Sequence, residues 1–375
     1  MILADRRRNV KIAPAAKATS SLCESQEYRD MAYKDENVSR VPVTIVTGFL
    51  GSGKTTLINH VLTANHGKKV AVIENEFGEV GIDDALVKLS SQEEIIEMNN
   101  GCICCTVRGD LVKILHKLLK RRNKFDYIII ETTGLADPAP VAQTFFVDDI
   151  LQEQLSLDAI VTVVDAKHVQ QHLDEIKPEG VENESVEQLA FADVVVINKT
   201  DLVTTSEKNT LKLRIKRING AAKIVETTKG QVDLDDVLNI KAFSLQKVLE
   251  MEPDFMKEEG QEHLHDESVI SVGIELEGNL DMHYVNMWLS KLLTEQGVDL
   301  FRSKGILAIE GSDDKYFFQG VHMLLSFGCS AEGMGQPWDP DEKRVNKLVF
   351  IGRNLDRAEL NKNFRAHRRI VLSPP

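Results

Sequence analysis

The segment "GFLGSGKT", residues 48–55, matches the pattern G-x-x-x-x-G-K-[S/T] of a phosphate-binding loop. It lies between an apolar run at 41–47 and a stretch whose apolar residues recur at helical spacing. In that context the glycines let the backbone approach a phosphate, and the helix N-terminus adds a favourable dipole. The sequence therefore predicts a strand, a phosphate-binding turn and a helix in succession.

Four more apolar runs rich in Val and Ile follow this loop. They are "KKVAVIENEF", "FDYIIIETTG", "LDAIVTVVDA" and "ADVVVINKTD". Helical stretches separate several of them, for example residues 110–122. Continuous apolar runs are typical of strands that are buried on both faces of a parallel sheet. The alternation predicts an α/β fold with a doubly wound, mostly parallel sheet.

A second, smaller unit is expected after the acidic segment 251–268. Strand-like runs occur at 268–278, 304–311, 315–325 and 346–355, with an amphipathic helix at 280–296 and a short closing helix. These features predict a smaller α+β C-terminal domain. The expected organisation is a disordered arm at 1–39, a nucleotide-binding domain at 40–250, a linker at 251–268, the C-terminal domain at 269–365 and a tail at 366–375.

Charge and cysteine content restrict the function classes. The net charge of −13 argues against a nucleic-acid-binding protein, and no apolar stretch approaches the length of a membrane span. The clustered cysteines favour a reducing compartment, so we expect a cytoplasmic protein. The first 21 residues are Arg-rich and nearly free of acids, so an organelle transit segment is the alternative.

Two motifs predict guanine-nucleotide binding. In the phosphate loop, Lys54 should reach the β and γ phosphates and Thr55 should bind Mg²⁺. The N-K-x-D motif at 198–201 follows an apolar run, and the Asp201 carboxylate can accept from two donors that guanine has and adenine lacks. GTP is therefore expected rather than ATP. The expected nucleotide-binding residues are Gly48, Gly51, Ser52, Gly53, Lys54, Thr55, Thr56, Asn198, Lys199 and Asp201.

A carboxylate and a glycine follow the apolar run at 125–130. Many GTPases carry Asp-x-x-Gly at this place, and here Glu131 takes the Asp position ahead of Gly134. We expect Glu131 to reach a Mg²⁺-bound water and Gly134 to act as a switch hinge before the proline-containing "LADPAP". The alternative is a carboxylate that only ends a strand.

Three of the five cysteines lie within four positions, at Cys102, Cys104 and Cys105. Thiolates are soft ligands that suit Zn²⁺, Cu⁺ and Fe–S clusters. Three thiolates leave a fourth position open, which suits a delivery site better than a closed structural site. Buried, inert thiols are the alternative.

The acidic stretch 74–84 holds further candidates. Glu74 and Glu79 could add oxygen ligands to the transition metal, and Asp83 or Asp84 could orient the attacking water or bind Mg²⁺. The alternative is a solvated acidic loop. The expected catalytic residues are thus Lys54, Asp83, Asp84 and Glu131.

The segments "TGFLGSGKTTL", "ENEFGE", "NGCICC", "ETTGLADPAP" and "NKTD" occur in this order. Together they resemble the CobW-type GTPases, the metallochaperone relatives of the urease and hydrogenase nickel-insertion GTPases. The segments "LFRSKGILAIEG", "FFQGVH" and "VFIGRNLD" resemble that family's C-terminal domain, especially in its eukaryotic zinc-directed members. The resemblance covers about residues 40–365. It implies a GTP- and Mg²⁺-dependent protein that carries a transition metal on its three clustered cysteines.

The expected function is a GTP-hydrolysing metallochaperone that delivers Zn²⁺ to a client protein, with Cu⁺, Co²⁺ and Fe²⁺ as open alternatives. A regulatory GTPase with structural cysteines, a redox sensor and a metal buffer are the competing hypotheses. Zinc-directed relatives use a Cys-Pro motif to engage a methionine aminopeptidase, but here Cys23 is followed by Glu24. The client is therefore left open, as is the oligomeric state, for which a homodimer is one alternative.

Overall fold

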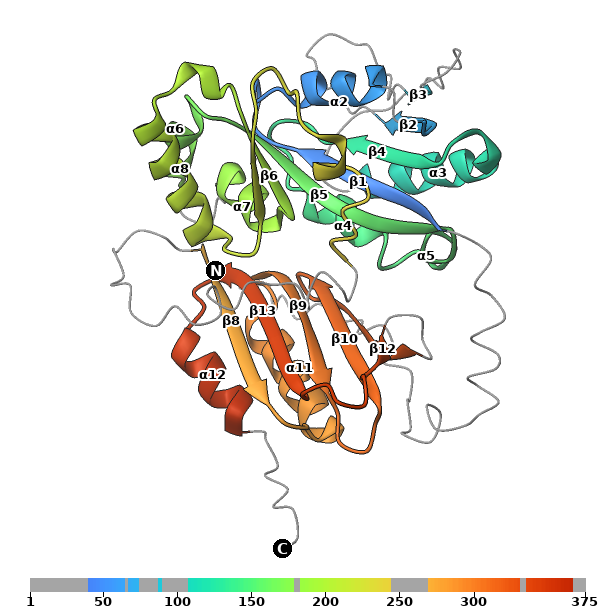
Figure 1. The fold of residues 1–375 in the computed structure, drawn as a ribbon, viewed down its shortest axis with the longest axis vertical. Coiled ribbons are helices and arrows are strands. Elements are labelled where there is room, and N and C mark those ends of the chain that lie inside the picture. The colour runs from blue at the N-terminus through green and yellow to red at the C-terminus, as the bar shows by residue number, and fades with distance from the viewer. Residues whose placement is uncertain are drawn as a thin grey trace, which may run out of the picture.

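The computed structural model describes residues 40–64, 67–73, 87–89, 107–178, 183–243, 269–330 and 335–366. Within these ranges the chain forms a seven-stranded sheet and a separate six-stranded sheet. The two units are stacked along the long axis of the molecule (Figure 1). The described residues include no helix that is long and apolar enough to cross a membrane.

The first sheet has the strand order β3-β2-β4-β1-β5-β6-β7. Its strands are β1 (Val41–Thr47), β2 (Val70–Ile73), β3 (Val87–Leu89), β4 (Tyr127–Glu131), β5 (Leu155–Asp165), β6 (Val194–Asn198) and β7 (Lys223–Glu226). All neighbouring pairs are parallel except β2 and β3. The predicted doubly wound, mostly parallel sheet is confirmed.

Helices cover both faces of this sheet, which explains why its strands are apolar on both sides. They are α2 (Lys54–Thr63), α3 (Val107–Leu119), α4 (Ala139–Thr144), α5 (Asp149–Gln154), α6 (Val169–Leu173), α7 (Glu184–Phe191) and α8 (Thr205–Ile218). Along β1, Ile45 is buried with Leu115 of α3 and Phe191 of α7 in one core cluster. The next residue, Val46, is buried with Leu57 of α2 in another. The parallel direction brings the carboxyl ends of β1, β4, β5 and β6 to one edge, where ligands bind in such folds.

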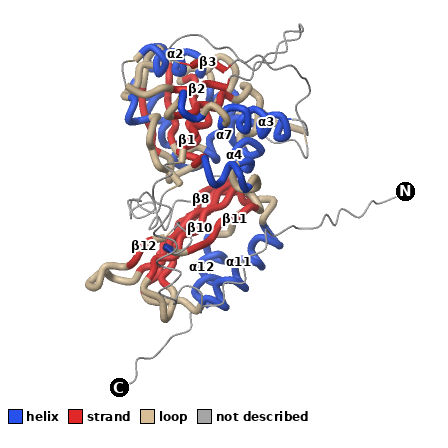
Figure 2. Tube along the Cα trace, turned by 90° about the vertical axis from the view of Figure 1, so that its right-hand side faces the viewer, coloured by secondary structure: helices blue, strands red, loops and turns tan. Residues whose placement is uncertain are grey.

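The second sheet is antiparallel, in the order β11-β10-β9-β13-β8, with β12 paired to β10. Its strands are β8 (Val269–Glu277), β9 (Leu300–Ala308), β10 (Asp314–Val321), β11 (Leu324–Gly328), β12 (Gln336–Pro337) and β13 (Val345–Arg353). Helices α11 (Met282–Gln296) and α12 (Arg357–Ala366) lie on one side of it (Figure 2). Trp288 of α11 and Phe364 of α12 pack with Phe350 of β13 in their shared core. The smaller α+β domain predicted from the sequence has this architecture.

One predicted strand is wrong. The run 315–325 is a hairpin of β10 and β11 rather than a single strand, with Val321 paired to Leu324 across a two-residue turn. His322 begins this turn with a φ of 51°. The turn was missed because positive φ at a tight hairpin is typical of Gly, Asn or Asp, and the residues here are His and Met.

A buried carboxylate binds the segment 240–241, near the end of the first domain in the sequence. Asp158 of β5 accepts hydrogen bonds from the backbone N–H groups of Ile240 (3.0 Å) and Lys241 (2.7 Å) and from the Tyr127 hydroxyl. It is only 4% exposed. Burial and the nearby carboxylate raise the pKa of Tyr127 far above its ordinary value, so the phenol keeps the proton that it donates.

Asp158→Ala should lower the free energy of unfolding of this domain by about 3 kcal/mol, because it removes the acceptor of the buried Tyr127 hydroxyl and of two partly buried backbone N–H groups. The matched control is Asp174→Ala, since Asp174 pairs with Arg214 but its side chain is 65% exposed. That variant should cost about 0.5 kcal/mol. Urea unfolding measures both, and equal losses would contradict the assigned role of Asp158.

Candidate functional site

The phosphate loop joins the end of β1 to the start of α2. Gly48, Gly51 and Gly53 all have positive φ, at 136°, 74° and 105°. A Cβ at Gly48 would collide with the Val163 carbonyl of β5, and one at Gly53 would collide with the Asn198 side chain of β6. Two of the motif's glycines are therefore required by close packing as well as by backbone direction.

Lys54 is the first residue of α2 and is only 7% exposed. Its ammonium group donates to the carbonyl oxygens of Gly48 (2.8 Å) and Phe49 (3.3 Å), so it lies folded against its own loop. Burial lowers the pKa of Lys54, and the nearby Glu131 carboxylate opposes that effect. The cation is held where the loop's backbone turns, which is where the motif predicts a phosphate.

Thr55 and Glu131 meet beside this lysine. The Thr55 hydroxyl donates to a carboxylate oxygen of Glu131 at 3.1 Å, although the two residues come from α2 and from the end of β4. Glu131 is 8% exposed. Hydroxyl and carboxylate oxygens are the hard ligands that Mg²⁺ prefers. The predicted pair is thus brought together, and its donor set fits that ion.

The N-K-x-D segment is joined to the phosphate loop by Asn198. Its carboxamide donates to the Ser52 carbonyl (2.9 Å) and accepts from the N–H groups of Lys199 (2.9 Å) and Gly230 (3.1 Å). Asp201 lies exposed in the turn Thr200–Leu202. An exposed carboxylate at this edge of the sheet is accessible to the guanine base of a nucleotide.

Asp165 is a site residue that the sequence analysis missed. It ends β5, and its carboxylate binds the Lys199 ammonium (2.7 Å) and the His168 ring (3.0 Å). Burial alone would raise the pKa of Asp165, but the hydrogen bonds from Lys199 and His168 outweigh it and lower that pKa. The available signal was its position at the end of an apolar run, at the same sheet edge as the predicted residues.

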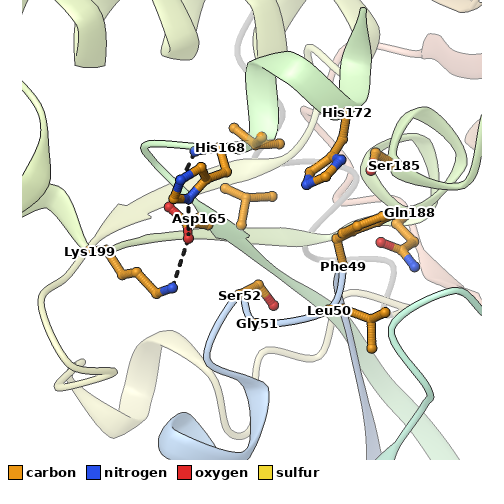
Figure 3. Close-up of a pocket in the computed structure, with 12 residues that line it drawn as sticks. Phe49, Leu50, Gly51, Ser52, Asp165, His168, His172, Ser185, Gln188 and Lys199 are labelled. Atoms are coloured by element: carbon orange, nitrogen blue, oxygen red, sulfur yellow. Dashed lines mark hydrogen bonds and ion pairs between the residues drawn. The ribbon is translucent and has the colours of Figure 1, made fainter. Parts of the chain in front are cut away.

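A pocket of about 250 Å³ flanks the loop on the side of β5, α6 and α7 (Figure 3). The Phe49 ring stacks on the His172 ring at 3.8 Å between centroids. The hydroxyl groups of Ser52 and Ser185 line this pocket, are buried and have no hydrogen-bond partner in the described part of the chain. Lys54, Thr55, Glu131 and Asp201 do not line it. The pocket therefore adjoins the phosphate loop without containing the predicted phosphate and magnesium groups.

The turn after β4 contacts the phosphate loop directly. A Cβ on Gly134 would lie 2.6 Å from the backbone nitrogen of Leu50, so the two backbones are in close contact. The predicted proline-stiffened stretch becomes the beginning of α4, with Pro138 at its N-cap. A movement of the loop backbone at Leu50 would therefore displace Gly134.

The expected metal-binding and water-orienting residues lie outside the described residues: Glu74, Glu79, Asp83, Asp84, Cys102, Cys104 and Cys105. No group of three His, Cys, Asp or Glu side chains suited to a metal occurs in the parts of the chain that are described. The structure does describe the elements that precede and follow these residues in the sequence. β2 ends at Ile73, which pairs with Ile130 of β4, and α3 begins at Val107. The acidic segment 74–86 therefore follows a strand that pairs with the Glu131 strand, whereas the cysteines come later in the sequence, after β3 and before α3.

Comparison with protein families gives two matches. Residues 42–226 match the CobW/HypB/UreG nucleotide-binding domain. Residues 269–368 match the cobalamin synthesis protein cobW C-terminal domain.

Similar whole proteins are also known. The chain is 36% identical over 329 residues to zinc chaperone YjiA of Escherichia coli, which covers 86% of this chain and 98% of that protein. It is 33% identical to zinc-regulated GTPase metalloprotein activator 1 of Schizosaccharomyces pombe, covering 86% of this chain and 85% of that protein. A crystal structure of Zn(II)-bound YjiA GTPase from E. coli matches with a TM-score of 0.67 and 34% identity, over 88% of this chain and 100% of that one.

Because the pKa of Lys54 is lowered, we predict that the protein takes up a proton when a nucleotide binds. Phosphate oxygens favour the ammonium form, so nucleotide binding should raise this pKa again. At alkaline pH, binding should then take up a proton at Lys54, and affinity should fall as pH rises through the lowered pKa. Calorimetric titrations in two buffers with different ionisation enthalpies measure the uptake. Lys54→Arg, which stays charged, is the control; equal binding enthalpies of the unsubstituted protein in both buffers would contradict the prediction.

Proposed function

The chain belongs to the CobW/HypB/UreG family of nucleotide-binding proteins, and we propose that it is a GTPase metallochaperone that binds Zn²⁺ and passes it to a metal-requiring client protein. The observation that carries this proposal is the meeting of the phosphate loop, Glu131 and the N-K-x-D segment at one sheet edge. The acidic segment with Glu74 and Glu79 follows β2, whose last residue pairs with Ile130 of β4 at the same edge.

Guanine nucleotide is the substrate that this arrangement fits. Lys54 is positioned to leave the carbonyls of its loop for phosphate oxygens, which are stronger acceptors for a charged donor. Asp201 is exposed where it can accept from guanine, and Asp165 holds the ammonium group of Lys199. In this proposal the glycines of the loop present backbone N–H groups to the phosphates.

Thr55 and Glu131 are the residues that would hold Mg²⁺. The ion would neutralise charge that develops on the phosphates during hydrolysis. In the described structure the hydroxyl of one donates to the carboxylate of the other, so both oxygens already converge on one place. Which carboxylate orients the attacking water is proposed from the sequence alone, as Asp83 or Asp84.

Zinc is proposed to bind Cys102, Cys104 and Cys105, with Glu74 and Glu79 as oxygen ligands. The two similar proteins named for zinc support this choice of metal. Glu74 directly follows Ile73, at the end of the strand that pairs with β4, and the cysteines come after β3 and before α3 in the sequence. In this proposal Glu74 and Glu79 link the edge that carries Glu131 to the metal.

Asp201→Asn should weaken GTP binding by about 2–4 kcal/mol, because a carboxylate that accepts two hydrogen bonds is lost. The amide at this position can pair with xanthine, so XTP should gain relative affinity. Competition binding with GTP, ATP and XTP checks this. Asp235→Asn, a carboxylate in the 3₁₀ turn Leu234–Asp236 of the same domain, is the matched control. An unchanged preference for GTP in the Asp201 variant would remove this residue from base recognition.

Replacing Cys102, Cys104 and Cys105 together by serine should abolish tight zinc binding and any zinc effect on GTP turnover, while GTP binding remains. The reason is that the cysteines lie outside the phosphate loop and thiolates are the zinc-selective ligands. The control is Cys329→Ser, because Cys329 is buried in the C-terminal domain. Turnover is measured with each metal buffered at a fixed free concentration. If metal leaves the turnover of the unsubstituted protein unchanged, a regulatory GTPase with structural cysteines is the better description.

A further inference from the structure

Gln188 of α7 fastens the turn that follows β4. It is 1% exposed, and its carboxamide nitrogen donates to the carbonyl oxygens of Gly134 and Ala136, both at 3.1 Å. A primary amide has two N–H groups, so both are used on this one turn. The Gln188 backbone carbonyl accepts from the Thr162 hydroxyl of β5 at 2.7 Å. The side chain is thus fixed at its base and directed at the segment that contacts the phosphate loop.

The C-terminal end of α7, one turn beyond Gln188, is bound to the C-terminal domain. Arg302 of β9 donates to the Phe191 carbonyl at 2.6 Å and to both carboxylate oxygens of Asp193, at 2.9 and 3.2 Å. The Arg302 and Asp193 side chains are 6% and 4% exposed. Asp193 also accepts from the backbone N–H of Ile160 in β5. A buried, bidentate ion pair therefore joins the end of α7 to the second sheet.

Aromatic packing surrounds this ion pair. The Phe191 ring lies 5.6 Å from the Phe301 ring and 5.2 Å from the His322 ring, both of which belong to the C-terminal domain. The Arg302 guanidinium lies 4.6 Å from the centre of the Phe243 ring. Gln188 and Phe191 are three residues apart on α7, a rise of about 4.5 Å along the helix. A displacement at Gln188 would reach Arg302 through a single short helix.

We propose that Gln188 is a positioning residue for the Gly134 turn, and that α7 carries the nucleotide state from this turn to the C-terminal domain through Arg302. The proposal rests on the GTPase function proposed above, because it requires GTP and GDP to favour different positions of the turn. Gly134 touches the Leu50 backbone of the phosphate loop, so a change at the γ-phosphate reaches Gln188 through one contact. The coupling must then be reciprocal: contacts at Arg302 bias which nucleotide binds better.

The alternative is that these hydrogen bonds only stabilise the fold. In that case the substitutions lower stability equally in both nucleotide states and leave the ratio of GTP to GDP affinity unchanged. Hydrogen exchange measured by mass spectrometry distinguishes the coupling role from the purely stabilising role. It is measured for β9 and β13 in the full chain, with GDP and with a non-hydrolysable GTP analogue.

In the unsubstituted protein, exchange in β9 and β13 should differ between the two nucleotides by about 5-fold or more. Gln188→Leu should remove this difference while both nucleotides still bind, whereas Gln152→Leu, an exposed glutamine of α5, should keep it. Identical exchange in both states, with both nucleotides bound, would overturn the proposal. Failure of either nucleotide to bind would count against the GTPase assignment instead, so the two failures are distinguishable.

The reciprocal experiment substitutes Arg302 and leaves the residues near the nucleotide unchanged. Arg302→Met should change the ratio of GTP-analogue to GDP affinity by about 5-fold or more, and Arg302→Lys, which keeps the charge, should restore part of it. This experiment decides the question if Gln188→Leu fails to fold. An unchanged affinity ratio in Arg302→Met would show that the interdomain ion pair is structural only.

Discussion

The arrangement of the nucleotide site depends on one side chain, the carboxamide of Asn198. Asn198 bonds the Ser52 carbonyl of the phosphate loop, the Lys199 backbone of the N-K-x-D segment and the Gly230 backbone of the following loop. It is 2% exposed, and its packing leaves no room for a Cβ at Gly53. Asn198 thereby holds three backbone segments at fixed spacing. Such preorganisation lowers the cost of ordering the loops upon binding.

From Asn198 at the end of β6, the contacts lead across the phosphate loop to β4, on the other side of β1. Glu131 meets Thr55 at the end of β4, and Gly134 touches Leu50. Gln188 then ties the Gly134 turn to α7, and Arg302 ties α7 to the second sheet. On the opposite side of β4, β2 is followed by the acidic segment that holds Glu74 and Glu79, two of the proposed zinc ligands. In the proposed function, the nucleotide edge of the sheet would therefore adjoin this acidic segment and, through α7, the C-terminal domain.

Sequence reasoning located the parts of the site that follow from local pattern. The phosphate loop, the Thr55–Glu131 pair and the parallel sheet follow from glycine spacing, strand ends and continuous apolar runs, because strand direction fixes which ends share an edge. Contacts between distant segments were not accessible. Arg302 and Asp193 are separated by 109 positions, and neither lies in a recognisable motif. The hairpin at His322 was missed because its turn residues are not those that favour positive φ.

In the proposed function, nucleotide and metal bind to linked states of the segment that carries the cysteines. The most direct measurement is a chelator-competition titration of zinc in the presence of GDP and of a non-hydrolysable GTP analogue. Zinc should bind more tightly with the GTP analogue, by a coupling of about 1–3 kcal/mol, because packing around the γ-phosphate should hold the cysteines in ligating geometry. Equal zinc affinity in the two nucleotide states would contradict the account and leave a static metal site on a GTPase.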